Sequence, residues 1–141
     1  MLTAGALAVA GFGLIAPATT ALAGCSGAGC VGLDPHSTGC DAHASTVSSA
    51  YGRTTQGVAV IYVEERWSSA CVANWTRITN LTSSGNWMEA NLIDQNNSSS
   101  QPWEGWVPGG NISWTNMGNG YHVQRACGDF TFGVGACANP V

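Results

Sequence analysis

The chain has 141 residues, with four arginines, no lysine, eight acidic residues and a formal net charge of −4 at pH 7. No basic run is present to neutralise phosphates, so we expect no nucleic-acid partner and no attraction to anionic membrane surfaces. The length is enough for one domain with a modest core, which gains stability from covalent staples.

Residues 1–23 form an almost uncharged, apolar segment. The apolar run from Ala4 to Ala16 has the length of a signal-peptide core and is too short to span a bilayer comfortably. Met1-Leu2-Thr3 lacks the usual basic residue, so we expect the printed start to lie downstream of the true one. We predict a signal peptide at residues 1–23, a single secreted β domain at residues 24–141, and no transmembrane span in the mature chain.

Cys25 has two interpretations. Ala21-Leu22-Ala23 is a signal-peptidase site that gives a secreted, extracellular protein, whereas Leu22-Ala23-Gly24-Cys25 is also a lipobox that gives a lipoprotein anchored at Cys25. An even number of cysteines in a small exported chain predicts disulfides throughout, and lipidation would leave one thiol over. We therefore favour the disulfide at Cys25 and keep the lipid anchor as the alternative. The six cysteines are Cys25, Cys30, Cys40, Cys71, Cys127 and Cys137.

The disulfide connectivity stays open at this point, because six cysteines allow fifteen pairings. Cys127 and Cys137 are spaced to staple a hairpin, and Cys30 and Cys40 are spaced to close a loop.

The elements follow in chain order. Residues 24–56 are rich in Gly, Ser, Ala and Thr; residues 24–40 predict a disulfide-pinned loop, and residues 41–52 predict a short helix capped by Asp41. Runs of β-branched and aromatic residues predict strands, and the Pro/Gly-rich stretch at 94–111 predicts a polar loop. Asn119-Gly120 predicts a hairpin turn. The predicted strands lie at 58–67, 71–78, 86–93, 112–117, 121–127 and 129–137.

Short strands separated by turns are typical of all-β proteins. We predict a small, disulfide-stapled β-sandwich or barrel with an irregular Cys/Gly-rich N-terminal loop.

Two groups of residues are compatible with a metal site or a catalytic site, but neither group establishes one. Cys25, Cys30 and Cys40 with His36 and His43 have spacings that suit zinc, but an exported chain favours disulfides over thiolates. The many serines, the histidines and the aspartates allow a Ser/His/Asp site, although no G-x-S-x-G elbow is present. We assign no catalytic residue, no metal and no cofactor, and we keep a small secreted hydrolase as the alternative function.

Neighbouring carboxylates on the strand predicted at 58–67 do not form a catalytic pair. Glu64 and Glu65 point to opposite faces because side chains alternate along a strand. Glu64 shares its face with Arg66, which predicts a surface ion pair of under about 1 kcal/mol.

Six tryptophans are many for this length, and most lie in predicted strands, where we expect them in the core. Trp103 and Trp106 differ, because they lie in the predicted loop QPWEGWVPGG. Exposed aromatics on a rigid loop stack on sugar rings or fill a partner's pocket, whereas a folded-back loop buries them as a lid. We predict Trp103 and Trp106 as binding residues for an extracellular protein or glycan.

Two motifs are more specific. CSGAGCVGLDPHSTGCDA follows the pattern C-x-G-x-x-C-x-G-x-D-P-x(4)-C, and ERWSSACVANWTR follows R-[YW]-S-x-A-C-x(3)-W-x-R. A third stretch, NMGNGYHVQRAC, lies near the C-terminal end, and the resemblance that these motifs carry extends over nearly all of residues 25–127. This combination resembles the YjfA-like family of small exported bacterial proteins of unknown function.

The resemblance implies a secreted, disulfide-bearing, mainly β domain with no established activity. It also implies that Cys25 belongs to the cysteine framework, and attachment of related domains to membrane-anchored regulators suits an extracytoplasmic binding role. The chain departs from relatives at Ser69, where they usually have proline, and at Val72, where they often have a basic residue. Cys137 lies beyond the region of resemblance.

The motif residues Arg66 and Arg77 flank the predicted turn between two strands. Guanidinium groups on neighbouring strands can hold a carboxylate bidentately, and we predict Asp34 as that carboxylate, which would tie the N-terminal loop to the sheet. We assign structural roles to Asp34, Arg66, Trp75 and Arg77. The function we predict is a non-catalytic extracellular binding or cell-envelope-associated module.

Overall fold

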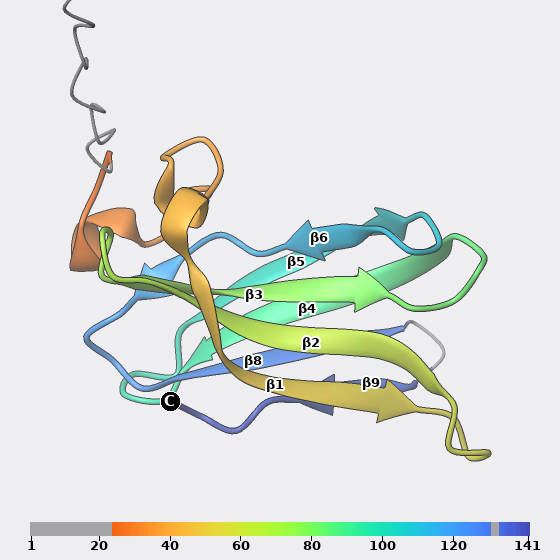
Figure 1. Cartoon of the computed structure of the whole chain (residues 1–141). Helices are drawn as coiled ribbons and strands as arrows, with labels where there is room; N and C mark the ends of the chain where they lie inside the picture. The colour runs from red at the N-terminus through yellow and green to blue at the C-terminus, as the bar shows by residue number, and fades with distance from the viewer. Residues whose placement is uncertain (1–23, 131–132) are drawn as a thin grey trace, which may run out of the picture.

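The computed structural model describes residues 24–130 and 133–141, so the predicted signal peptide at 1–23 lies outside the described residues. The described chain forms two antiparallel sheets packed face to face (Figure 1). This confirms the predicted all-β, disulfide-stapled architecture and identifies it as a sandwich. Within the described ranges there is no helix of the length and apolarity needed to cross a membrane.

The first sheet has the strand order β1-β2-β3-β6, and the short strand β7 also pairs with β3. The β2–β3 hairpin is the centre of this sheet, and its register places Glu64 directly opposite Arg77. The strands are β1 (Ser45–Arg53), β2 (Ala59–Ser68), β3 (Ala73–Asn80), β6 (Ile112–Trp114) and β7 (Gly118–Asn119).

The second sheet has the order β5-β4-β8-β9, with β5 at one edge. Its register aligns Glu104 of β5 with Glu89 of β4, and Glu89 with Asp129 of β8. The strands are β4 (Asn86–Asp94), β5 (Ser100–Val107), β8 (Gln124–Phe130) and β9 (Gly135–Cys137).

The main core lies between the two sheets. Alternate residues of each strand point inward, so Ile61 and Val63 from β2 pack against Met88 from β4 and Phe130 from β8. All four side chains are almost fully removed from water. Burial of such side chains stabilises the fold by roughly 1.5–3 kcal/mol each.

A second, smaller core lies on the outer face of the first sheet, beneath the N-terminal loop. The loop contains two 3₁₀ turns, η1 (Gly27–Cys30) and η2 (Cys40–His43). Its cysteines pack against Trp75 of β3 and against Met117, and both of these side chains are buried. The loop therefore covers a sheet face that would otherwise expose apolar surface.

Four local predictions are wrong. Residues 129–137 do not form one strand, because Asp129 and Phe130 end β8 and Gly135–Cys137 form β9, which pairs back on β8. Residues 45–53 form strand β1 instead of continuing a helix from Asp41, because they pair along the edge of β2. The stretch predicted as a polar loop at 94–111 contains β5, whose Pro102 lies on an edge strand, where proline is tolerated. Asn119 belongs to β7 and pairs with β3, so Asn119-Gly120 does not turn a hairpin between the flanking strands.

Candidate functional site

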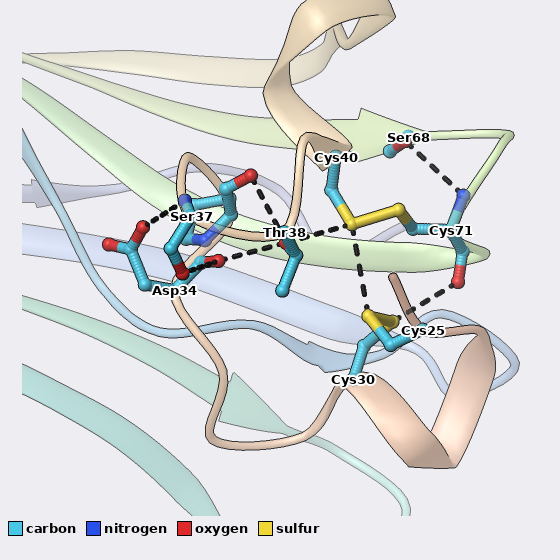
Figure 2. The surroundings of a disulfide bond; sticks show 9 residues. Cys25, Cys30, Asp34, Ser37, Thr38, Cys40, Ser68 and Cys71 are labelled. Carbon is cyan, nitrogen blue, oxygen red and sulfur yellow. Dashed lines mark hydrogen bonds between the residues drawn. A yellow bond between two sulfur atoms is a disulfide. The ribbon is translucent and has the colours of Figure 1, made fainter. Parts of the chain in front are cut away.

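All six cysteines are in disulfides: Cys25–Cys30, Cys40–Cys71 and Cys127–Cys137. The predicted staple between Cys127 and Cys137 is confirmed, and it joins β8 to β9. The suggested Cys30–Cys40 bridge is wrong, because Cys40 bonds to Cys71 in the turn between β2 and β3 (Figure 2). The three disulfides suggest an oxidising, extracellular environment.

The arginine fork predicted from the sequence forms, but its carboxylate is Glu64 and not Asp34. Arg77 donates from Nε and Nη2 to the two oxygens of Glu64, each at 2.7 Å. Thr46 donates its hydroxyl to Glu64 at 2.6 Å and accepts a bond from Arg66. Burial alone would raise the pKa of Glu64, but the bonds from Arg77 and Thr46 hold that pKa below its usual value.

The ion pair expected between Glu64 and Arg66 is present, but it is buried and not on the surface. The shortest distance between their charged atoms is 3.9 Å, and Glu64 is only 4% exposed. Arg66 also donates to the carbonyl of Ala44, which joins the end of η2 to β2. The motif residues therefore build the joint between the N-terminal loop and the first sheet.

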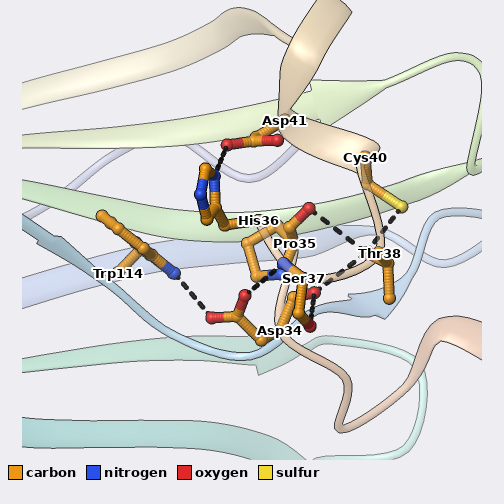
Figure 3. A network of polar contacts seen from close by, with 8 residues as sticks. All are labelled: Asp34, Pro35, His36, Ser37, Thr38, Cys40, Asp41 and Trp114. Atoms are coloured by element: carbon orange, nitrogen blue, oxygen red, sulfur yellow. Dashed lines mark hydrogen bonds and ion pairs between the residues drawn. The ribbon is translucent and has the colours of Figure 1, made fainter. Parts of the chain in front are cut away.

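Asp34 ties the loop to the sheet through a different partner. Its carboxylate accepts a hydrogen bond from Trp114 Nε1 on β6 at 2.9 Å and another from the Ser37 amide at 2.7 Å (Figure 3). Partial burial acts to raise the pKa of Asp34, but these hydrogen bonds outweigh it and hold the pKa below its usual value. Asp34 thus connects the loop to the sheet through Trp114 and not through the arginines.

The histidines do not meet a serine nucleophile among the described residues. His122 Nδ1 pairs with Asp94 at 2.6 Å, and its Nε2 lies 3.4 Å from the side-chain nitrogen of Asn119. His36 Nδ1 bonds to Asp41 at 2.7 Å on the surface, and this bond raises the pKa of His36 (Figure 3). The His–Asp half of a Ser/His/Asp site is therefore present at His122, while no recorded hydrogen bond joins His122 to a serine hydroxyl.

The tryptophans are distributed differently from the prediction. Trp103 and Trp106 lie on β5 and not in a loop, so they project to opposite faces of the second sheet. Trp103 packs against the main core, whereas Trp106 is 62% exposed. The outward partner of Trp106 is Trp87 on β4, which lies directly opposite in register and is 45% exposed.

Trp87 is the functional candidate that sequence reasoning missed. Met88, Ala90 and Leu92 alternate as buried residues of β4, and the same alternation turns Trp87 outward. The signal was present in the sequence, but tryptophans in strands were expected in the core.

Trp106 is held by close packing on the loop before β4. A Cβ atom added at Gly85 would lie 2.5 Å from Trp106 Cζ2 and 2.7 Å from its Nε1. The indole therefore lies directly over the Gly85 backbone, and any larger residue there would displace it. This contact limits the motion of the ring while leaving most of its surface in water.

A shallow groove of about 470 Å³ runs beside the tryptophan pair on the same sheet. It is crossed by the row Glu104–Glu89–Asp129, which stands two residues along the strands from the Trp106–Trp87 row. Burial raises the pKa of Asp129. Like charges directly opposite on neighbouring strands are destabilising, so this row weakens the sheet on its own.

The floor of the groove carries further polar and apolar groups. Asn91 lies there with its Oδ1 buried and without a hydrogen-bond partner in the described part of the chain. Ile93 and Pro102 supply apolar walls, and Cys127 of the β8–β9 disulfide lines one side. The surface made by Trp87, Trp106, Glu89, Glu104 and Asp129 is called the outer binding face below.

The family model described as "Protein of unknown function (DUF2690)" matches residues 28–126. This match covers more than half of the chain, so the protein belongs to the DUF2690 family. No curated protein and no solved structure was found to match the chain. The family defines a class of disulfide-stabilised β domain here and leaves its activity to be argued from the site.

Proposed function

We propose that the protein is a non-catalytic extracellular module that binds glycans on the outer binding face. The observation that carries this proposal is the cross-strand pair of exposed indoles, Trp87 and Trp106. Large exposed aromatics on a rigid sheet offer flat apolar area at low entropic cost, which suits the C–H faces of sugar rings.

The carboxylate row supplies the polar half of such a site. Ionised Glu89 and Glu104 have only acceptor oxygens, and sugar hydroxyls are donors that match them. A groove of about 470 Å³ falls within the range of small-ligand sites and is large enough for part of an oligosaccharide. Donors from the ligand would also relieve the repulsion within the row, so an otherwise unfavourable arrangement becomes complementary when occupied.

Secretion and bacterial origin belong to the same proposal. The signal-like segment at 1–23, the disulfides and the resemblance to the YjfA-like family support export to the cell exterior or envelope. The Cys25–Cys30 bond favours release after Ala23, because a lipid-bearing Cys25 has no sulfur valence left for Cys30. Intact mass of protein from its native host, before and after reduction, separates this from the lipid-anchored alternative, which adds diacylglycerol to Cys25.

The binding proposal is tested by co-sedimentation with insoluble polysaccharides, including cellulose, chitin and peptidoglycan. We expect the wild type to bind at least one of them, and Trp106→Ala and Trp87→Ala each to weaken binding about tenfold, as loss of a central aromatic contact does. Tyr121→Ala is the matched control, since Tyr121 is 75% exposed and does not line the groove. Equal loss in all three variants, or no binding by the wild type, would reject the proposal.

A further inference from the structure

Four cysteine sulfurs gather on the opposite side of the molecule, where the N-terminal loop covers the first sheet. The Sγ atoms of Cys25, Cys30, Cys40 and Cys71 all lie within 4.8 Å of one another. They belong to two disulfides, and Cys25 Sγ stands 3.8 Å from Cys40 Sγ across the gap between them (Figure 2). Two disulfides thus pack as one sulfur cluster.

The cysteines are also held in place by contacts that do not depend on the S–S bonds. The amide of Gly27 donates to the carbonyl of Cys71 at 2.8 Å, and the amide of Cys40 donates to Pro35 at 2.9 Å. The hydroxyl of Thr38 donates to Cys40 Sγ at 3.1 Å, a contact that also favours a thiolate at that sulfur. We therefore expect the four sulfurs to stay near one another when the disulfides of the folded chain are cleaved.

Burial reinforces this arrangement. Cys30, Cys40 and Cys71 are at most 1% exposed and pack with Trp75 and Met117 in the second core. Apolar packing of this kind persists when the S–S bonds open, because it depends on side-chain contact and not on sulfur oxidation.

Four thiolates at this spacing match the preferred environment of zinc. Zn²⁺ takes four ligands in a tetrahedron with Zn–S bonds of about 2.3 Å, which sets the sulfurs about 3.8 Å apart. Cys25 and Cys30 have the C-x₄-C spacing common in structural zinc sites. We propose that Cys25, Cys30, Cys40 and Cys71 form a redox-gated metal site, closed as two disulfides when oxidised and binding one Zn²⁺ when reduced.

The chemistry balances with an external reductant. Each disulfide takes two electrons and two protons from a dithiol, which is oxidised to its own disulfide, and yields two thiols. Zinc then binds the four sulfurs as thiolates and displaces their four protons to solvent. Metal and disulfides are alternative states of the same four atoms, so oxidation of the site releases the zinc. The two sequence-predicted histidine candidates, His36 and His43, take no part.

The test uses the full chain, reduced anaerobically with tris(carboxyethyl)phosphine, which consumes one phosphine and one water for each disulfide opened. Co²⁺ is then titrated as a probe, because a tetrahedral cobalt–thiolate centre has intense visible d–d bands and a thiolate charge-transfer band. We expect these bands to saturate at one Co²⁺ per chain and to disappear when Zn²⁺ is added. The oxidised protein should show none of them.

Two double variants separate this site from non-specific thiol binding. Cys127→Ser/Cys137→Ser removes the other disulfide and should keep the cobalt spectrum, whereas Cys25→Ser/Cys30→Ser should lose it. Thermal unfolding of the reduced protein gives a second readout, because a metal that binds only the folded state raises Tm. We expect zinc to raise Tm in the wild type and in Cys127→Ser/Cys137→Ser, but not in Cys25→Ser/Cys30→Ser.

Either of two results would overturn the proposal: cobalt bands of equal strength in both double variants, or a reduced wild type whose fold and Tm do not respond to zinc. If reduction unfolds the chain, recovery of the far-ultraviolet β spectrum on adding zinc supports the site, and failure to recover it rejects the site.

Discussion

The buried negative charge of Glu64 is stabilised by Arg77. Glu64 is only 4% exposed, and its carboxylate receives two charge-assisted hydrogen bonds from the guanidinium group of Arg77. Removing one partner of such a pair leaves an uncompensated charge, so Arg77→Ala should lower the free energy of unfolding by about 3 kcal/mol. Urea denaturation monitored by tryptophan fluorescence measures this loss.

Two further variants show whether the stability lost in Arg77→Ala comes from the geometry of the two hydrogen bonds or from the positive charge alone. Arg77→Lys keeps the charge but not the two-pronged bond, so we expect an intermediate loss. Arg125→Ala removes an equal charge from an exposed position on β8 and should change the free energy of unfolding by less than about 0.5 kcal/mol. An Arg77→Ala protein as stable as Arg125→Ala would contradict the role assigned to the pair.

Glu65 is the opposite case, a buried carboxyl without a cation. It is fully buried, it accepts a hydrogen bond from Asn74, and the backbone amide of Ala126 also acts to lower its pKa. Burial raises the pKa of Glu65 from its usual value of 4.5 to about 8. Between these pKa values the folded state holds a proton that the unfolded state has lost, so stability falls as pH rises, by at most about 1.4 kcal/mol per pH unit.

Glu65→Gln tests this pH dependence, because it is neutral in both states. We expect the wild type to lose stability relative to Glu65→Gln as pH rises from about 5 to about 8. Every other ionisable group is common to both proteins, so the difference between the two curves isolates Glu65. Parallel curves from urea denaturation across this pH range would show that Glu65 is already ionised when folded.

Across elements, the carboxylate row of β5, β4 and β8 predicts a conflict between stability and binding. Glu89 stands in register between Glu104 and Asp129, so Glu89→Gln removes two unfavourable neighbours at once. We expect a gain of roughly 0.2–1 kcal/mol in the free energy of unfolding together with weaker polysaccharide binding. Because the gain comes from exposed charges, it should shrink in about 1 M salt. If Glu89→Gln is less stable than the wild type at low salt, the carboxylates of this row do not repel one another as proposed.

The disulfides also differ by the elements that they join. Cys127–Cys137 closes a hairpin of sequence separation 10, whereas Cys40–Cys71 spans 31 and fastens the loop to the β2–β3 turn. Chain-entropy arguments give about 3 kcal/mol for the shorter loop and about 4 kcal/mol for the longer one. Paired serine variants compared by calorimetry should follow this order, and a larger loss at Cys127–Cys137 would contradict it.

At the scale of the molecule, the strands with strong periodicity were predictable from the sequence. The β-branched run of β2 and the alternation in β3 and β4 indicated strands close to their observed bounds. Strand β5 was not predictable, because Pro102, Glu104 and Gly105 are typical of a loop, and only the edge position of β5 makes the proline acceptable.

The candidate sites were less predictable, because they depend on register and on the path of the loop. Trp103 and Trp106 were expected together, and assigning them to a strand separates them and gives Trp106 a partner from β4. The carboxylate row brings together residues as far apart in sequence as Glu89 and Asp129, which no local pattern aligns. Cys71 belongs to the sulfur cluster although it lies outside the N-terminal loop, and no local sequence pattern predicts that contact either.

The two faces of the sandwich therefore serve different purposes in this account. The part of the outer face of the first sheet around Trp75 is covered by the stapled loop, which leaves Trp75 only 2% exposed. The outer face of the second sheet is left open with Trp87 and Trp106 in water. Exposed indoles on an uncovered sheet face are typical of a binding surface. We therefore place the ligand on the outer face of the second sheet.

The most direct test of this account is the set of indole N–H signals in a ¹⁵N–¹H spectrum, assigned by single substitutions and followed during titration with soluble β-1,4-linked oligosaccharides of glucose and of N-acetylglucosamine. Binding on the outer binding face predicts that the Trp87 and Trp106 signals move together with one affinity, while buried Trp75 stays in place. Shifts confined to Trp67 or Trp114, or no shift with either series, would contradict the assignment of this face as a glycan site.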